Sequence, residues 1–136
     1  MSCQKLTLRL IEENPGDEKI LPFHYFDIMR SDVVVGKISL RFGDNFHSYY
    51  NGHIGFEIFP EYRGNNYAFQ AVTLILVIAK KHGMNKIYLT CTQSNMTSKR
   101  IFEKLNAVFI ENAKIPKECF FYRDGIEDYS IYCLNF

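Results

Sequence analysis

The chain of 136 residues is long enough for one ordinary domain, and its 47% of apolar residues can form a proper hydrophobic core. The net charge of +1 is spread without basic or acidic blocks, which argues against binding of nucleic acid and against a polybasic membrane anchor. The four cysteines form no C-x-x-C pair and none lies at metal-ligand spacing from a histidine, so we expect reduced thiols, no bound metal and a cytoplasmic protein.

The first half of the chain is patterned as strands. Residues 6–11 alternate apolar and polar side chains, and residues 33–42 are rich in β-branched side chains. The turn signal Asn14-Pro15-Gly16-Asp17 places a loop over residues 12–22, and polar turns follow at 31–32 and 43–45. We therefore predict four strands before Pro60, at residues 6–11, 24–29, 33–42 and 52–59.

The second half begins with the strongest helical pattern in the chain. Residues 67–82 are apolar on most sides of a helix, and Gly83 is a natural C-cap for it. Asn95 is a typical N-cap for a second helix through Leu105, and Asn106 suits the left-handed conformation that ends such a helix. We predict three further strands, at residues 86–92, 107–110 and 129–134.

The order of these elements predicts the architecture. The strand–helix–strand unit at residues 52–92 implies a locally parallel pair with a right-handed crossover, and antiparallel hairpins precede and follow it. We expect one α+β domain over residues 1–136, in which two main helices pack on a mixed, mostly antiparallel twisted sheet of about seven strands.

The junction between the fourth strand and the long helix has the features of an anion site. A strand runs into the short polar loop 63–66 and then into a helix, which points several backbone N–H groups and the positive end of the helix dipole at one place. Such a site suits a phosphate or pyrophosphate. An ordinary turn before a helix explains the pattern about equally well, and the spacings of a P-loop and of a dinucleotide-binding turn are absent.

Two motifs around this junction carry a resemblance to a known family. Residues 63–68 fit a pattern of Gln or Arg, two variable residues, Gly, one variable residue and Gly or Ala, except that Asn66 stands in the Gly position. Residues 95–98 fit N-x-x-S and lead into a helix that ends in Phe102-Glu103-Lys104-Leu105. With one strand between them, the motifs resemble the GNAT family of acetyl-CoA-dependent N-acetyltransferases, and the tail 122–129 resembles its ribosomal-protein-type members.

The resemblance, which extends from residue 52 to the C-terminus, implies acetyl-CoA as co-substrate. It implies a splayed central strand pair, with the pantetheine arm lying in the gap along the backbone of Ile58, Phe59 and Pro60. The amides that would hold the pyrophosphate are those of Gly64, Asn65, Asn66, Tyr67 and Ala68. Arg63 would add positive charge or remain a solvated loop residue, and Asn95 would contact the pantetheine arm, cap its helix, or do both.

Three positions depart from the family pattern. Asn66 places a polar side chain where the family prefers bare backbone, so it would either crowd the pyrophosphate or hydrogen-bond to it. Phe102 stands where many members have a Tyr that protonates the departing thiolate. Thr90 stands where some members have a catalytic Glu, and a threonine cannot act as that base.

Acetylation of an amine needs a base, a polarised thioester carbonyl and a proton for the thiolate. We expect Glu57 to be the base, with His53 as second choice on the same face of the strand; the competing interpretations are a surface carboxylate and a structural imidazole. A backbone N–H near Phe59 would polarise the carbonyl. Ser98, by resemblance, or a tyrosine such as Tyr122 or Tyr129, would supply the proton.

The sequence thus predicts an N-acetyltransferase that moves the acetyl group of acetyl-CoA onto a primary amine by direct attack in a ternary complex. The acceptor would be a protein N-terminus, a polyamine or another small amine, and the short loop 12–22 predicts an open acceptor pocket. The alternatives are a catalytically quiet acyl-CoA-binding regulatory domain and a nucleotide-binding module. The interpretation involves no nucleic acid and no membrane, and it is compatible with a homodimer.

Overall fold

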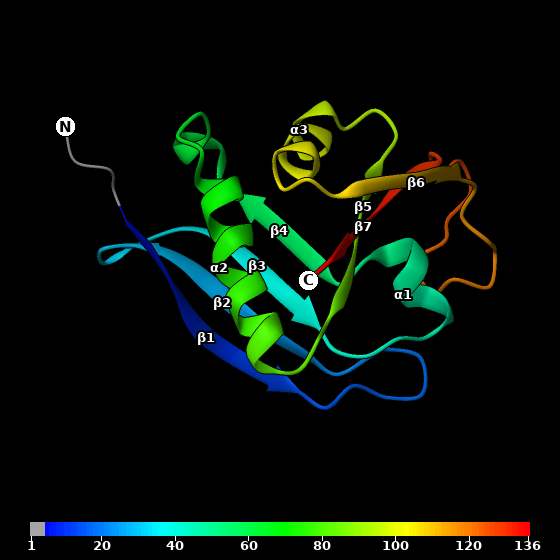
Figure 1. Ribbon diagram of the computed structural model, residues 1–136, viewed down its shortest axis with the longest axis horizontal. Coiled ribbons are helices and arrows are strands. Elements are labelled where there is room, and N and C mark those ends of the chain that lie inside the picture. Colours follow the sequence, from blue (N-terminus) through cyan, green and yellow to red (C-terminus); the bar gives the residue numbers. More distant parts are fainter. Residues whose placement is uncertain (1–4) are drawn as a thin grey trace.

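The computed structural model describes residues 5–136, so Cys3 lies outside the described part of the chain. This part forms seven strands, three α-helices and one 3-10 helix (Figure 1). Their bounds, in chain order, are β1 Leu6–Asn14, β2 Phe23–Arg30, β3 Val33–Arg41, α1 Phe46–Asn51, β4 Ile54–Ile58, a 3-10 turn Pro60–Tyr62, α2 Tyr67–Lys81, β5 Lys86–Thr92, α3 Met96–Lys104, β6 Val108–Ala113 and β7 Tyr129–Asn135.

The α+β architecture is confirmed, and the splay between β4 and β5 divides the seven strands into two sheets. One sheet has the order β1-β2-β3-β4 and the other the order β5-β7-β6, and every pairing within them is antiparallel. The two sheets meet where β4 begins, because the His53 N–H donates to the carbonyl of Tyr88 at 2.9 Å. From this junction β4 and β5 diverge along their lengths (Figure 1).

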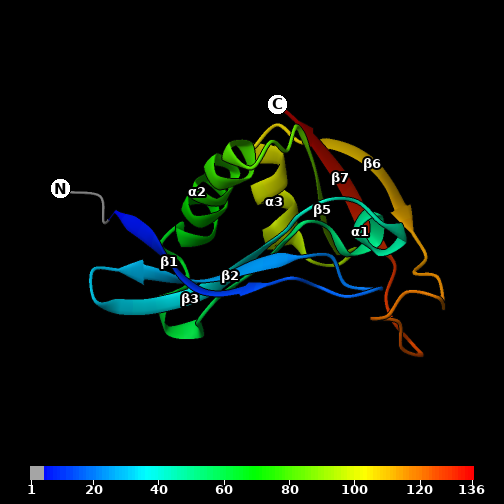
Figure 2. The ribbon, with the colours of Figure 1, turned by 90° about the horizontal axis from the view of Figure 1, so that it is seen from below.

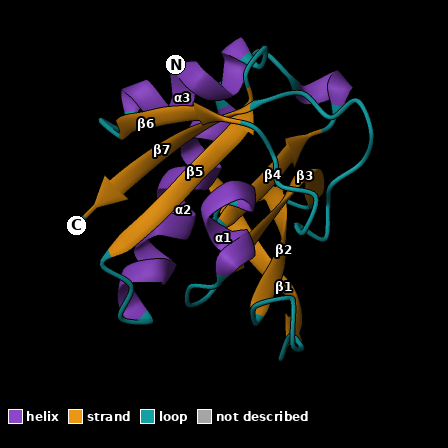
Figure 3. Cartoon of the chain, turned by 90° about the vertical axis from the view of Figure 1, so that its right-hand side faces the viewer, coloured by secondary structure: helices purple, strands orange, loops and turns teal. Residues whose placement is uncertain are grey.

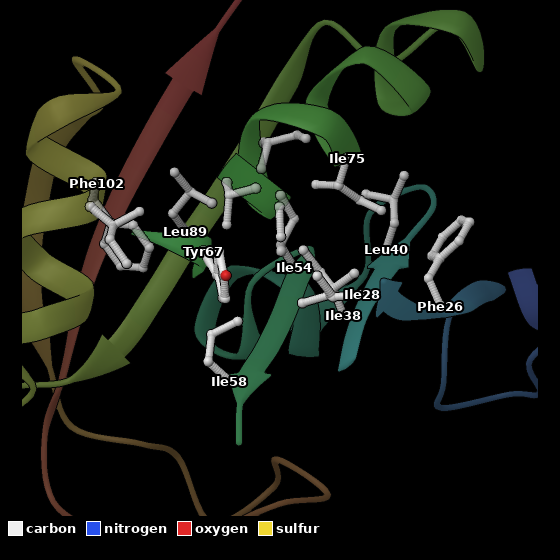
Figure 4. Close-up of a cluster of buried hydrophobic side chains, with 14 of the residues drawn as sticks. Phe26, Ile28, Ile38, Leu40, Ile54, Ile58, Tyr67, Ile75, Leu89 and Phe102 are labelled. Atoms are coloured by element: carbon white, nitrogen blue, oxygen red, sulfur yellow. The ribbon is translucent and has the colours of Figure 1, made fainter. Parts of the chain in front are cut away.

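Helix α2 forms because its apolar residues recur at helical spacing and bury one stripe. Tyr67, Ala71, Val72, Ile75 and Ala79 are buried, and the helix packs over β1, β3 and β4. Figure 2 shows α2 and α3 on the same side of the four-stranded sheet. The core between these layers includes Ile28, Ile38, Leu40, Ile54, Leu89 and Phe102 (Figure 4).

The other face of the three-stranded sheet is covered by α1, a helix that the sequence patterns did not predict. The helix contacts β5 and β7 (Figure 3), and the Tyr49 hydroxyl donates to the Glu111 carboxylate on β6. A capping box starts it: the Asn45 side chain accepts from the Ser48 N–H at 2.9 Å, and Ser48 Oγ accepts from the Asn45 N–H at 3.0 Å.

The predicted turns and helix ends are confirmed, and the strand ends differ by a few residues. In the first loop, Asn14 Oδ1 accepts the Gly16 N–H at 2.9 Å. The ladder between β1 and β2 continues to Asn14, so the loop is shorter than predicted. Gly83 and Asn106 both have positive φ, 81° and 62°, and each follows the C-cap residue of its helix, α2 or α3. In the described residues, no helix is both long and apolar enough to cross a membrane.

Candidate active site

A cleft of about 750 Å³ lies between the end of β4, the start of α2 and one face of α3. It brings the first sequence motif, residues 63–68, together with the second, residues 95–98, which lies far from it in the chain. The lining residues are Phe56, Glu57, Ile58, Tyr62, Arg63, Gly64, Asn66, Tyr67, Ala68, Phe69, Asn95, Thr97, Ser98, Arg100, Ile101 and Lys104. Nine of the thirteen residues that the sequence singled out are therefore in one cleft.

The start of α2 forms one wall of this cleft. Gly64 has φ 86° and Asn66 has φ 63°, so the loop turns through two left-handed residues before the helix begins at Tyr67. The Asn66 side chain does not cap the helix, and the first helical backbone bond runs from Gln70 to the Asn66 carbonyl. The N–H groups of Tyr67, Ala68 and Phe69 are thus the orphan donors of a helix N-terminus, and all three residues line the cleft.

The free edge of β4 forms a second wall, and the strand register shows which of its groups face the gap. The Phe59 N–H donates to the Val35 carbonyl at 2.9 Å and the Arg41 N–H donates to the His53 carbonyl at 2.7 Å. Hydrogen-bonded pairs alternate along an antiparallel ladder, so Gly55 and Glu57 bond to β3 while Phe56 and Ile58 direct their N–H and C=O groups away from it, toward β5.

This register makes one sequence prediction, a polarising backbone N–H near Phe59, more specific. The Phe59 N–H is already bonded to β3, so it is not free to polarise a thioester carbonyl, and the N–H groups of Phe56 and Ile58 face the gap instead. The Ile58 carbonyl accepts a hydrogen bond from Arg63 Nε at 3.0 Å, which ties the loop before α2 to the end of β4. Phe59, Pro60 and Asn65 are not among the residues that line the cleft.

Of the predicted catalytic side chains, two line the cleft and one does not. The Glu57 carboxylate is exposed at the end of β4, and Ser98 is buried in the first turn of α3, where its N–H donates to Asn95 Oδ1 at 3.0 Å. Asn95 is therefore a helix cap that also lines the cleft. Tyr122 lies in the loop between β6 and β7, and its hydroxyl donates to Asp124 Oδ1 at 3.4 Å.

His53 has a structural role, because both of its ring nitrogens are used inside the protein. Its side chain is 1% exposed, Nδ1 accepts the Tyr88 N–H at 2.9 Å, and Nε2 lies 2.8 Å from the Gly43 carbonyl. Since a backbone N–H can only donate, Nδ1 carries no proton and Nε2 donates to Gly43. Burial lowers the pKa of His53, so the ring is a neutral link between β4 and β5.

The two other departures from the family pattern lie outside the cleft. Phe102 is 1% exposed and packs edge-on against Tyr132 at 5.2 Å between ring centroids, so it belongs to the hydrophobic core. The Thr90 hydroxyl oxygen is buried and has no hydrogen-bond partner within the described residues. Neither residue lines the cleft.

The sequence analysis gave no role to the basic face of α3, although Lys104 is part of the second motif. Arg100 and Lys104 line the cleft together with Arg63, and Glu57 is the single acidic residue in the lining. Residues 97, 100, 101 and 104 recur at intervals of three and four, so they share one face of the helix that Asn95 begins. This spacing, read from the cap, is the signal that could have identified them.

The fold is shared with solved acetyltransferase structures of low sequence identity. Mutant spermidine/spermine N-acetyltransferase SpeG from Vibrio cholerae has a TM-score of 0.71 at 17% identity, covering 96% of this chain and 94% of that one. The ribosomal-protein-S5-alanine acetyltransferase from Vibrio fischeri has a TM-score of 0.66 at 21% identity, covering 83% of this chain and 61% of that one. The microcin C7 self-immunity acetyltransferase MccE, in complex with acetyl-CoA and AMP, has a TM-score of 0.65 at 15% identity, covering 84% and 61%.

This chain spans about three fifths of the length of several of these proteins, 61% of MccE and of the Vibrio fischeri enzyme. No curated protein sequence matches it. The sequence profile of the acetyltransferase (GNAT) family matches residues 4–107, a range that contains both motifs and every residue lining the cleft. The chain therefore belongs to the acetyltransferase (GNAT) family.

Proposed function

We propose that this protein binds acetyl-CoA in the cleft and transfers its acetyl group to a primary amine in a ternary complex. One observation carries the proposal: a single cleft joins a free strand edge, three orphan amides and three cationic side chains. A pantetheine arm is an extended chain with amide groups, and it can pair with a strand edge. A diphosphate is a polyanion, and it suits a helix N-terminus flanked by cations.

The residues at the strand end of the cleft would carry the chemistry. The N–H groups of Phe56 and Ile58 face the gap, where they would donate to the thioester carbonyl oxygen as negative charge develops on it. Glu57 would accept the proton that the amine loses, directly or through one water. Ser98 Oγ would donate its proton to the sulfur as the carbon–sulfur bond breaks, which leaves the acetylated amine and free CoA. Exchange with water would then return a proton to Ser98 and remove the one held by Glu57.

The amine class of the acceptor rests on the family and on the open surroundings of Glu57. Two structural neighbours are named for acetylation of spermidine or spermine and of the alanine of a ribosomal protein. The residues between β1 and β2 form only a short loop, so no helix from that connection covers the acceptor side. We propose a polyamine or a peptide N-terminus as acceptor, and a cytoplasmic location follows as part of the same proposal.

The second candidate is an acyl-CoA-binding domain without turnover. The position of Phe102 favours it, because the phenyl ring is in the core and α3 contains no tyrosine that could donate a proton. Turnover separates the two candidates. Release of free CoA thiol should follow mixing with acetyl-CoA and spermidine or an alanine- or serine-initiated peptide; binding without release for any of these amines would favour the quiet domain.

Binding itself is tested by thermal or denaturant unfolding with acetyl-CoA, CoA or ATP. At a ligand concentration of 100 Kd, the free energy of unfolding should rise by about 2.7 kcal/mol for the first two ligands. ATP at the same concentration serves as the control, because it has phosphates but no pantetheine arm to pair with β4. Equal stabilisation by ATP would indicate a nucleotide site and contradict the proposal.

The catalytic assignment is tested by Glu57→Gln, with Glu61→Gln as a matched control outside the cleft. Loss of a general base should lower kcat about a hundredfold or more and leave the Kd for acetyl-CoA unchanged. Ser98→Ala should lower kcat in the same manner. Wild-type kcat in both variants would remove these two residues from the mechanism without affecting the cofactor site.

A further inference from the structure

Lys104 and Asn66 are joined across the mouth of the cleft. Lys104 Nζ, at the end of α3, donates to Asn66 Oδ1, at the start of α2, at 3.2 Å. The same ammonium lies 4.1 Å from the centroid of the Phe69 ring, within the range of a cation–π contact. All three residues line the cleft, so a charged group from one helix is held over the N-terminus of the other.

This bridge depends on Asn66, a position that departs from the family pattern. Asn66 has φ 63°, a conformation that glycine adopts most readily and that Asn tolerates better than other residues. A glycine there would allow the same backbone but could not reach Lys104. The structure therefore gives the Asn66 side chain a role that a glycine could not fill, as acceptor of the hydrogen bond from Lys104.

We infer that Lys104 is a ligand of the CoA diphosphate and that Asn66 is the positioning residue that holds it in place. This inference rests on the proposed function and adds to it a specificity element in this chain. The orphan amides of Tyr67, Ala68 and Phe69 lie beside the bridge, so a diphosphate on them comes within reach of Nζ. An ammonium has three donors; one stays on Asn66 Oδ1 while others bond to phosphate oxygens, so the two contacts do not compete.

The energetic reason for a bridge is the flexibility of lysine. A free lysine side chain loses much rotamer entropy when it is fixed by a ligand, and here part of that entropy is already lost in the free protein. The affinity for the diphosphate is raised accordingly. Arg100, one turn earlier on α3, adds charge to the cleft but has no such link to α2 among the described residues.

The experiment measures Kd by calorimetry for acetyl-CoA in wild type, Lys104→Gln, Asn66→Gly and the double variant. Each single variant should bind acetyl-CoA several-fold to about tenfold more weakly, the range expected for one hydrogen bond or ion pair at a solvent-exposed position. The double variant should be little weaker than Lys104→Gln, because Asn66 acts through Lys104. Lys99→Gln, which makes the same charge change on α3 outside the cleft, should bind as wild type does.

A comparison of three acetyl donors, acetyl-CoA, acetyl-dephospho-CoA and acetyl-pantetheine, identifies the phosphate group that Lys104 contacts. The penalty of Lys104→Gln should persist with acetyl-dephospho-CoA, which keeps the diphosphate but lacks the 3′-phosphate. With acetyl-pantetheine, which has neither the diphosphate nor the 3′-phosphate, Lys104→Gln should have the same kcat/KM as wild type. A penalty that vanishes with acetyl-dephospho-CoA would overturn the assignment to the diphosphate, and a penalty that persists with acetyl-pantetheine would indicate a structural role.

The role of Asn66 has its own test. Tighter binding by Asn66→Gly would mean that Asn66 withholds Lys104 from the ligand, and additive losses in the double variant would mean that the residues act independently; either result overturns the inference. Asn66→Asp keeps the acceptor oxygen but adds a negative charge, so it should weaken binding more than Asn66→Gly. If wild type did not bind acetyl-CoA at all, the result would contradict the proposed function, and with it the role of Lys104.

Discussion

At the scale of single residues, His53 is a buried polar side chain whose two ring nitrogens form hydrogen bonds within the fold, which leaves none for catalysis. The neutral ring accepts from the Tyr88 N–H and donates to the Gly43 carbonyl, so it links the two sheets. Burial is the largest cause of its lowered pKa, opposed by the Gly43 carbonyl and by Asp44, whose Oδ1 is 3.3 Å from Nε2.

This environment predicts a loss of stability in mild acid. The pKa of His53 in the folded protein lies below the ordinary value of 6.5, so the unfolded chain takes up a proton first as the pH falls through 6.5. The free energy of unfolding should therefore decrease from pH 7.5 to 5.5, measured by urea unfolding. This pH range lies above the range in which Asp27 affects stability, because the pKa of Asp27 is lowered from 3.8, chiefly by its hydrogen bond from Arg9.

The matched variants for this prediction are His53→Gln and His82→Gln. The first should lower stability at pH 7.5 by about 1–3 kcal/mol, because a buried backbone group loses its partner, and it should flatten the pH dependence. His82 is exposed at the end of α2, so its replacement should leave the pH dependence unchanged. An unaltered slope in His53→Gln would assign the acid sensitivity to another group.

Residue roles were predictable to the extent that they follow from local motifs. The start of α2 and the first turn of α3 were assigned from the order of polar residues in 63–68 and 95–98, and most of these residues line the cleft. His53 and Glu57 share a face of one strand, yet one is buried and the other exposed. His53 is enclosed by Tyr88 of β5 and by the loop at Gly43, and no pattern within residues 52–59 contains this difference.

At the scale of elements, α1 is the helix that sequence patterns miss. Its six residues, Phe46–Asn51, include aromatic side chains with strand preference, and it is too short to show a helical period. Its signal is the pair Asn45 and Ser48, which form a capping box with serine in place of the usual Glu or Gln. The helices α2 and α3 were predictable because their apolar residues repeat over two or more helical turns, and β5 was predictable because its centre is a nearly continuous run of apolar residues.

The capping box predicts a measurable contribution to stability. Asn45→Ala removes the acceptor for the Ser48 N–H and should lower the free energy of unfolding by about 1 kcal/mol. Asn51→Ala, at the other end of α1, is the control. Because α1 covers the three-stranded sheet opposite α3, Asn45→Ala should leave the Kd for acetyl-CoA unchanged; a weakened Kd would show that α1 supports the cleft.

At the scale of the whole molecule, the division into two sheets creates the functional edge. Sequence order implied a parallel pair around the crossover helix, and the splay followed from the family resemblance. The width of the gap depends on packing between distant segments: His53 and Tyr88 hold the strands together at one end, and α3 packs against β5 and forms one wall of the cleft. No local pattern determines this separation.

The free edge of β4 should be visible in amide hydrogen exchange. In the unliganded protein the N–H groups of Phe56 and Ile58 face the gap, whereas those of Gly55 and Glu57 bond to β3. The first pair should therefore exchange faster than the second, measured residue by residue by NMR. Acetyl-CoA at saturation should slow exchange at Phe56 and Ile58, because the pantetheine arm pairs with that edge, and should leave Gly55 and Glu57 nearly unchanged.

CoA should protect the same two amides, whereas ATP, which lacks the arm, should not. Protection of all four amides before ligand is added would mean that the gap is closed in solution, and protection of the α2 amides alone would place the diphosphate correctly but the arm elsewhere.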